Sequence, residues 1–213
     1  WSVKWLIREI VLSQSYQLDS QPDDRQAELD AEGIYLSYRR VRRLSAEALR
    51  DAMLATAGSL DGGLHGPSVP VHLTDKMTGR GRPGQSGPLD GQGRRTVFVE
   101  IRRNFLDPFL LAFDFPMPST TVGDRHVSNV PAQALGMLNN PLTTELARRW
   151  ATRMEEQFED PRQRVAAMFE TAFGRSATDD ELAACLETIN DATLSWSDLA
   201  HILLNAKEFS YLR

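Results

Sequence analysis

The spacing of apolar residues in the last third of the chain constrains its fold more than any other feature. Beyond residue 131, Leu, Ile, Val, Met and aromatic residues recur at steps of three and four, which is the period of one face of an α-helix. Helix start signals precede the successive apolar stretches, namely Pro131, Asn140-Pro141, Asp160-Pro161, Thr178 with Glu181, and Ser195. The pattern predicts helices almost to the end, with Leu135, Leu138, Leu146, Phe169 and Leu203 in a common core.

Two helices are also predicted in the first quarter. Residues 2–15 carry an apolar face behind a possible cap at Ser2, and residues 46–57 lie between Ser45 and Gly58, which suit the two helix ends. Residues 19–33 are polar and indicate a surface segment or a weak helix. A short helix is expected to open at Asp107-Pro108.

The middle of the chain, from about 61 to 95, has a different character. Nine of the 14 glycines lie there with four prolines, and such a stretch cannot present a regular apolar face. It lacks the GxxxxGK[ST] pattern of a phosphate-binding loop. A long loop is therefore predicted. Residues 96–101 alternate and are β-branched, which predicts a strand that pairs with 69–73 as a small hairpin.

Together these patterns predict a mainly α protein, an irregular helical domain of about six or seven helices with one small β-hairpin. The chain has 213 residues, 41% of them hydrophobic, which is enough for one shared core. We therefore expect a single domain over 1–213, with the Gly/Pro-rich loop inside it. The chain begins at Trp1 within an amphipathic pattern, so we expect it to be a piece of a longer protein.

Composition excludes some functions. The formal net charge is −5, whereas a duplex nucleic-acid binder usually has a basic footprint. The run Arg39-Arg40-Val41-Arg42-Arg43 is interpreted as solvated or internally paired, with an anionic partner as the alternative. No apolar run approaches the roughly 20 residues that span a bilayer. Cys185, the single cysteine, is interpreted as a small core residue rather than a reactive thiol.

One polar cluster is the best candidate for a site. Its members surround proline-rich turns between two predicted helices, where functional side chains are often displayed; they are Asp114, Arg125, His126, Asn129, Gln133 and Asn139. Asp114 and Arg125 could pair, and His126 could titrate near neutral pH. The alternative is purely structural, since such residues also cap helices and hold loops. We take Asp114, Arg125 and His126 as catalytic candidates and Asn129, Gln133 and Asn139 as binding candidates.

Other kinds of chemistry find less support. The four histidines are scattered, without the spacing of a metal site, so no metal and no cofactor is expected in this domain. There is no GxSxG elbow. Paired carboxylates for glycoside cleavage leave no sequence spacing, and Glu100 with Asp114 would be the candidates. The four tryptophans are interpreted as core or domain-interface residues rather than as a sugar-stacking platform.

Several short stretches, taken in order, carry a family resemblance. They include Trp1-Ser2-Val3-Lys4, Arg42-Arg43-Leu44-Ser45-Ala46-Glu47, Phe113-Asp114-Phe115-Pro116, Val130-Pro131-Ala132-Gln133 and Leu138-Asn139-Asn140-Pro141. In this order the chain resembles the planctomycete-type C-terminal domain of unknown function numbered fifteen fifty-three. The resemblance covers essentially the whole chain, although Phe98 stands where the family tends to have Tyr.

The resemblance implies a setting but supplies no catalytic residues. Members of that family stand behind cytochrome-c-like domains in large exported proteins. It implies a periplasmic or extracellular location, a haem-bearing domain upstream, and contacts with the upstream domains of the same chain. The leading hypothesis is thus a non-catalytic interaction or scaffolding module. The alternative is an exported enzyme or binding domain that acts on polysaccharide near Asp114, Arg125 and His126; the sequence leaves open whether the protein is an enzyme.

Overall fold

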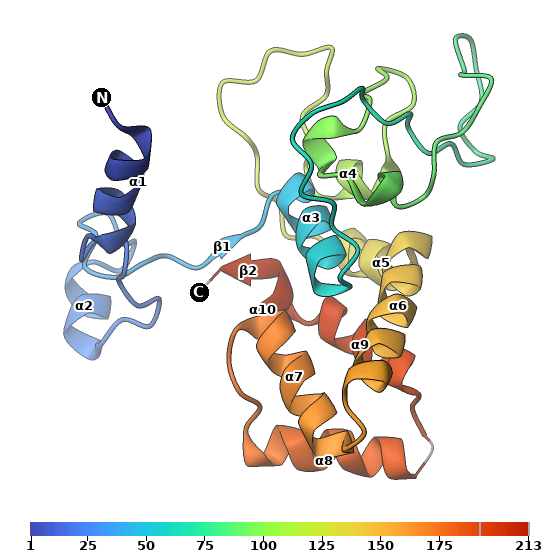
Figure 1. Cartoon of the computed structure of the whole chain (residues 1–213). Coiled ribbons are helices and arrows are strands. Elements are labelled where there is room, and N and C mark those ends of the chain that lie inside the picture. The colour runs from blue at the N-terminus through green and yellow to red at the C-terminus, as the bar shows by residue number, and fades with distance from the viewer. Residues whose placement is uncertain (192, 213) are drawn as a thin grey trace. The chain divides into compact units, whose positions relative to one another are not determined.

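The computed structural model describes residues 1–191 and 193–212, and these fall into two compact units. Unit 1 comprises residues 1–43 and the C-terminal residues from 211 onward, and unit 2 comprises residues 44–210. Both are drawn in Figure 1. The predicted single domain over 1–213 stays a prediction.

Unit 1 contains two short helices and one pair of strands. Helix α1 (Val3–Leu12) begins after Ser2, whose hydroxyl accepts from the Trp5 N–H as expected. Helix α2 (Asp24–Leu29) begins with a capping box formed by Asp23 and Gln26, within the segment predicted as polar surface. Strand β1 (Arg42–Arg43) pairs antiparallel with β2 (Tyr211–Leu212). Two arginines of the basic run thus lie in a strand.

A buried carboxylate organises the turn between α2 and β1. Asp30 accepts hydrogen bonds from the Ile34 N–H at 2.7 Å and from the Ser37 hydroxyl at 2.8 Å, and further bonds from two backbone N–H groups. Apolar residues contribute little to unit 1, since no residue of α1 or α2 is buried. Local polar contacts therefore give this unit much of its shape.

Unit 2 is helical. Its α-helices are α3 (Ala46–Thr56), α4 (Pro108–Ala112), α5 (Pro131–Asn139), α6 (Pro141–Gln157), α7 (Pro161–Phe173), α8 (Asp179–Asn190), α9 (Trp196–Asn205) and α10 (Lys207–Ser210), with 3-10 turns η1 (Gly91–Gly93) and η2 (Thr96–Phe98). The predicted mainly α class with one small antiparallel pair of strands is confirmed. The described residues form ten α-helices rather than the six or seven predicted, partly because the polar segment before residue 30 forms α2 and the predicted last helix is divided into α9 and α10.

The predicted starts of these helices are confirmed at the level of single hydrogen bonds. Asn140 caps α6 by accepting from the Leu142 N–H, and Asp160 caps α7 by accepting from the Arg162 N–H. Thr178 forms the predicted capping box of α8 with Glu181. These N-caps accept hydrogen bonds from backbone N–H groups that have no partner inside the helix. Their effect is local, so the sequence alone could place them.

The core of unit 2 is centred on α6, which packs along α9 (Figure 1). Trp150, Leu146 and Leu204 are completely buried there. The same core takes in side chains from α3, α4, α5, α7 and α10. Burial of this apolar surface is the main stabilising contribution for the unit. Helix α8 packs on α7 and adds partly buried residues at the edge.

The predicted hairpin between 69–73 and 96–101 is wrong. Residues Thr96–Phe98 form a 3-10 turn, and only one bridge joins Val69 to Val99, in parallel. The antiparallel pair is β1 with β2 instead. Thr96 turns inward because its N–H and hydroxyl both donate to Asp51 on α3, at 2.7 Å each. A side-chain carboxylate thus takes the place of a partner strand.

The expected buried face of α5 is also wrong. Leu135 and Leu138 are 58% and 52% exposed, whereas Gln133 and Met137 are buried. The helix is only nine residues long and begins at Pro131. Gln133 turns inward because the polar groups of the preceding loop bind it. Leu146, Phe169 and Leu203 are buried as predicted.

The Gly/Pro-rich segment lacks long regular elements, as expected, but it is anchored. Val71 and Leu73 are buried with Phe105 in a second small cluster. Gly87 donates its N–H to the Val71 carbonyl, and any Cβ at Gly87 would collide with the Pro70 carbonyl. Glycine at this position therefore permits two backbone segments to lie against each other.

Candidate functional site

Asp114, the first residue of the predicted polar cluster, closes the long loop between α4 and α5. Its backbone is left-handed, with φ of +62°. Its carboxylate accepts from the Ser128 N–H at 2.8 Å and from the Ser128 hydroxyl at 2.8 Å. Gln133 Nε2 donates to the same Ser128 hydroxyl at 3.0 Å and lies 3.5 Å from Asp114 Oδ2. Asp114, Ser128 and Gln133 therefore form one hydrogen-bond network at the base of the loop, which we call the Asp114 network.

Arg125 and His126 lie further out on this loop, and both are exposed. The Arg125 guanidinium forms an ion pair of 2.9 Å with Glu47 of α3. The sequence allows Arg125 to pair with Asp114 but does not predict Glu47 as its partner. Residues 114–117 and 120–126 line a hollow of about 600 Å³, so the three catalytic candidates do border one space.

The remaining site candidates do not gather around this hollow. Asn129 is exposed beside Ser128. Asn139 is the last residue of α5, where its Nδ2 donates to the Leu135 carbonyl at 2.9 Å, and it borders a different cavity. Glu100, the second glycosidase candidate, forms an exposed ion pair of 2.8 Å with Arg102.

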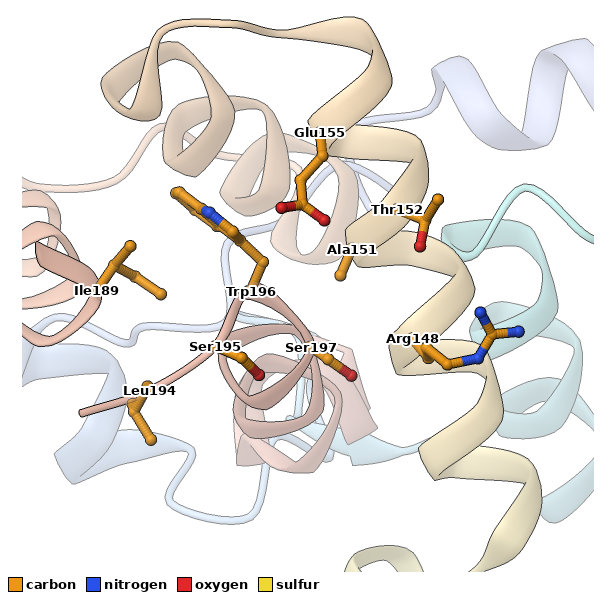
Figure 2. A pocket seen from close by; sticks show the side chains of 9 residues that line it. All are labelled: Arg148, Ala151, Thr152, Glu155, Ile189, Leu194, Ser195, Trp196 and Ser197. Atoms are coloured by element: carbon orange, nitrogen blue, oxygen red, sulfur yellow. The ribbon is translucent and has the colours of Figure 1, made fainter. Parts of the chain in front are cut away.

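A second hollow, of about 450 Å³, lies where α6, α8 and α9 meet. Figure 2 shows Glu155 reaching from α6 toward the indole of Trp196, at the first turn of α9. The guanidinium of Arg164 lies 4.3 Å from the centre of that indole ring. The Ser195 hydroxyl donates to Asp198 at 2.6 Å, so it serves the capping box of α9. Glu155 pairs with Arg164 at 4.0 Å, and we assign no reaction to this hollow.

The thiol of Cys185 is partly buried on α8 and free. Burial raises its pKa, and the negative charge of Glu181 raises it further. A thiol with a raised pKa is mostly protonated at neutral pH and is a poor nucleophile. This agrees with the interpretation of Cys185 as a small packing residue.

Among residues 1–191 and 193–212, no group of three or more His, Cys, Asp or Glu side chains could hold a metal ion. Within the same residues, no helix combines the length and the apolar content that a membrane crossing requires.

Comparison with known proteins agrees with the resemblance. No curated protein and no solved structure matches the chain. A family model described as PSD1, protein of unknown function (DUF1553), matches residues 1–189. Because this match covers most of the sequence, the chain belongs to the PSD1 family of proteins of unknown function, DUF1553.

Proposed function

We propose that this chain is a non-catalytic interaction module of a large exported protein, and that α1 is the helix by which it docks. The observation that carries the proposal is the solvent exposure of α1. The helix is amphipathic, yet none of its residues is buried. Burial of apolar surface contributes about 25 cal/mol per Å² of stabilisation. A partner that covers this face of α1 would therefore form a more stable complex.

The exposed face is continuous along the helix. Val3, Leu6, Ile7 and Ile10 are between 50% and 70% exposed. Their spacing is that of one helical face, as in helices that lie in an apolar groove. An isolated helix of 10 residues is marginal in water, so docking would also stabilise the helix itself.

The size of this face favours a partner in the same polypeptide. Ten helical residues span only roughly 15 Å, and such a face is small beside the ~800 Å² per partner of a standard stable interface. A covalent link raises the effective concentration of the partner to the order of millimolar, which compensates for a small contact. We therefore name an upstream, cytochrome-c-like domain of the same chain as the partner; any haem would belong to that domain.

Hydrogen exchange tests this proposal. We expect the α1 amides of the complete natural protein to exchange at least tenfold more slowly than those of the 213-residue chain, because docking suppresses fraying. The double substitution Ile7→Gln with Ile10→Gln should remove this protection. The matched control, Arg8→Gln with Glu9→Gln, changes two neighbouring polar residues of the same helix and should retain it. Equal exchange of α1 in both proteins would contradict the proposal.

The second candidate function is binding or cleavage of polysaccharide at the loop between α4 and α5. The hollow bordered by Asp114, Arg125 and His126 favours it. A screen of polysaccharides by affinity electrophoresis would reveal a ligand. His126→Ala should then abolish binding, because it removes a side chain that borders the hollow. The variant should still fold, since His126 is exposed and is not part of the Asp114 network. Undiminished binding by a folded His126→Ala variant would exclude this site.

A further inference from the structure

A third cavity, of about 260 Å³, lies where three helix ends converge in unit 2. The start of α4, the end of α5 and the start of α6 meet there, beside the extended segment around His72. We call this the helix-junction cavity. Its polar lining includes His72, Asp107, Asn139 and Asn140, and its apolar lining includes Phe109 and Leu142. Among these residues, only Asn139 is a site candidate from the sequence, whereas Asp107 and Asn140 are predicted there as helix starts.

Two of the polar residues, Asp107 and Asn140, are helix caps. In each, one side-chain oxygen accepts the cap hydrogen bond, and the other polar group of the side chain does not take part in the cap. Asp107 Oδ1 accepts from the Phe109 N–H at 2.8 Å, and Asn140 Oδ1 accepts from the Leu142 N–H at 2.8 Å. In the described part of the chain, no hydrogen bond or ion pair reaches the second oxygen of Asp107 or the Nδ2 group of Asn140. Asp107 therefore retains an acceptor with negative charge, and Asn140 retains a donor.

The other two polar residues are each held by a backbone carbonyl. Asn139 Nδ2 donates to the Leu135 carbonyl at 2.9 Å. His72 Nδ1 lies 3.0 Å from the Gly87 carbonyl, and a carbonyl can only accept, so the proton is assigned to Nδ1. In the neutral ring His72 Nε2 is then an acceptor, and Asn139 Oδ1 is another.

Three polar side chains of this cavity retain an acceptor, and one of these acceptors is charged. Asp107, Asn139 and His72 offer them, whereas Asn140 offers an amide donor. The hydroxyl of Thr74, which also lines the cavity, can donate or accept. The buried guanidinium of Arg50 feels the negative charge of Asp107. That guanidinium donates to Asp90, Arg94 and Thr96 instead and does not line the cavity.

We propose that the helix-junction cavity binds a primary ammonium group that carries a short aliphatic chain. An ammonium ion has three donors and no acceptor, which complements the acceptors of Asp107, Asn139 and His72. The buried side chains of Phe109 and Leu142 would contact the aliphatic part. A cavity of about 150 Å³ already holds a benzene molecule, so 260 Å³ has room for a chain of a few carbons.

The test is a titration of the ¹⁵N-labelled chain with n-butylammonium chloride, followed by the amide resonances of the cavity. We expect saturable shifts at Asn139 and Asn140, and shifts with n-butanol at least tenfold weaker in affinity. Asp107→Asn should weaken n-butylammonium binding at least tenfold, because asparagine caps a helix as well as aspartate does but is neutral. The matched control is Asp160→Asn, the same substitution at the Asp-Pro start of α7, which should change affinity less than twofold.

Asn139→Asp provides a second variant that does not touch the cap of α4. It adds a negative charge at an exposed residue of the cavity and should tighten n-butylammonium binding severalfold. Titration with N-acetyl-lysine methylamide distinguishes the source of the ammonium group. Tighter binding of this compound supports a lysine of a protein partner, and exclusive binding of n-butylammonium supports a free amine. The proposal is overturned by absence of saturation, by equal affinity for n-butanol, or by an Asp107→Asn variant with unchanged affinity.

Discussion

Glu181 shows how one charged residue ties the stability of unit 2 to pH. Arg175 donates to both of its carboxylate oxygens at 2.8 Å, and this contact lowers the pKa of Glu181 from its ordinary 4.5 to about 2. A lowered pKa in the folded state stabilises the protein above pH 4.5, and the stabilisation disappears as the pH falls toward 2. The pair is about one-third exposed, so water screens much of its energy.

We therefore expect Glu181→Gln to cost about 1 kcal/mol of unfolding free energy at pH 7 and almost nothing at pH 2. Glutamine keeps the capping box with Thr178, so the loss reports on the charge. Urea unfolding at both pH values measures it. Glu187→Gln, on the exposed face of the same helix, is the control. A loss of equal size at pH 7 and pH 2 would rule out the ion pair as its cause.

Caps of single helices could be predicted at this scale because both partners lie within three residues, as Thr178 and Glu181 do. The partners of the site candidates could not. Arg125 pairs with Glu47, which lies 78 positions earlier in the chain. Asp107 looked like a simple helix cap, and nothing in its own neighbourhood showed that Asn139 and His72 would share a cavity with it.

At the scale of elements, glycine has opposite roles at the ends and in the interior of helices. Gly174 ends α7 with φ of +68°, where any Cβ would find open space. Gly136 lies inside α5, and a Cβ there would contact the Ala112 side chain at 3.7 Å. Alanine strains the left-handed backbone at the first position, and it reduces the entropy of the unfolded chain at the second.

We expect Gly174→Ala to destabilise the protein by about 1 kcal/mol, and Gly136→Ala to stabilise it by roughly 0.5 kcal/mol or more. Thermal unfolding of both variants beside the natural sequence gives the two signs directly. Because the substitution is the same, each variant is the control for the other. Shifts of melting temperature in the same direction would contradict this assignment.

Helices proved easier to predict than strands in this chain, for a physical reason. Helices such as α6 and α8 are specified by hydrogen bonds and caps within the segment itself. A strand needs a partner, and Thr96, at the start of the predicted strand, bonds to Asp51 on α3 instead. The face of α5 was mispredicted on similar grounds, because Gln133 binds the Asp114 loop and draws the polar side of the helix inward.

At the scale of the whole molecule, the long loop of unit 2 is held in place by one buried cation. Arg50 of α3 is 3% exposed. It donates to the Asp90 carbonyl at 2.7 Å, to the Arg94 carbonyl at 3.0 Å and to the Thr96 hydroxyl at 3.1 Å. Burial lowers the pKa of this guanidinium, while the nearby charge of Asp51 opposes that shift. These contacts join positions 40 to 46 residues apart.

Replacement of Arg50 by methionine should therefore lower the unfolding free energy by about 3 kcal/mol, because several buried acceptors lose their donor at once. Arg102→Met, which removes the exposed pair with Glu100, should cost less than about 1 kcal/mol. Urea unfolding gives both values, and limited proteolysis within residues 61–95 should accelerate only for Arg50→Met. Similar losses for the two variants would show that Arg50 is not the anchor.

The packing of α6 along α9 also has a consequence for how the protein is made. Nearly forty residues separate the end of α6 from the start of α9, and a ribosome needs on the order of 2–8 seconds to add them at 5–20 residues per second. During that interval the nascent α6 displays Trp150 and Leu146 without their later neighbour. The nascent chain thus exposes an apolar surface to which chaperones can bind until α9 has been synthesised.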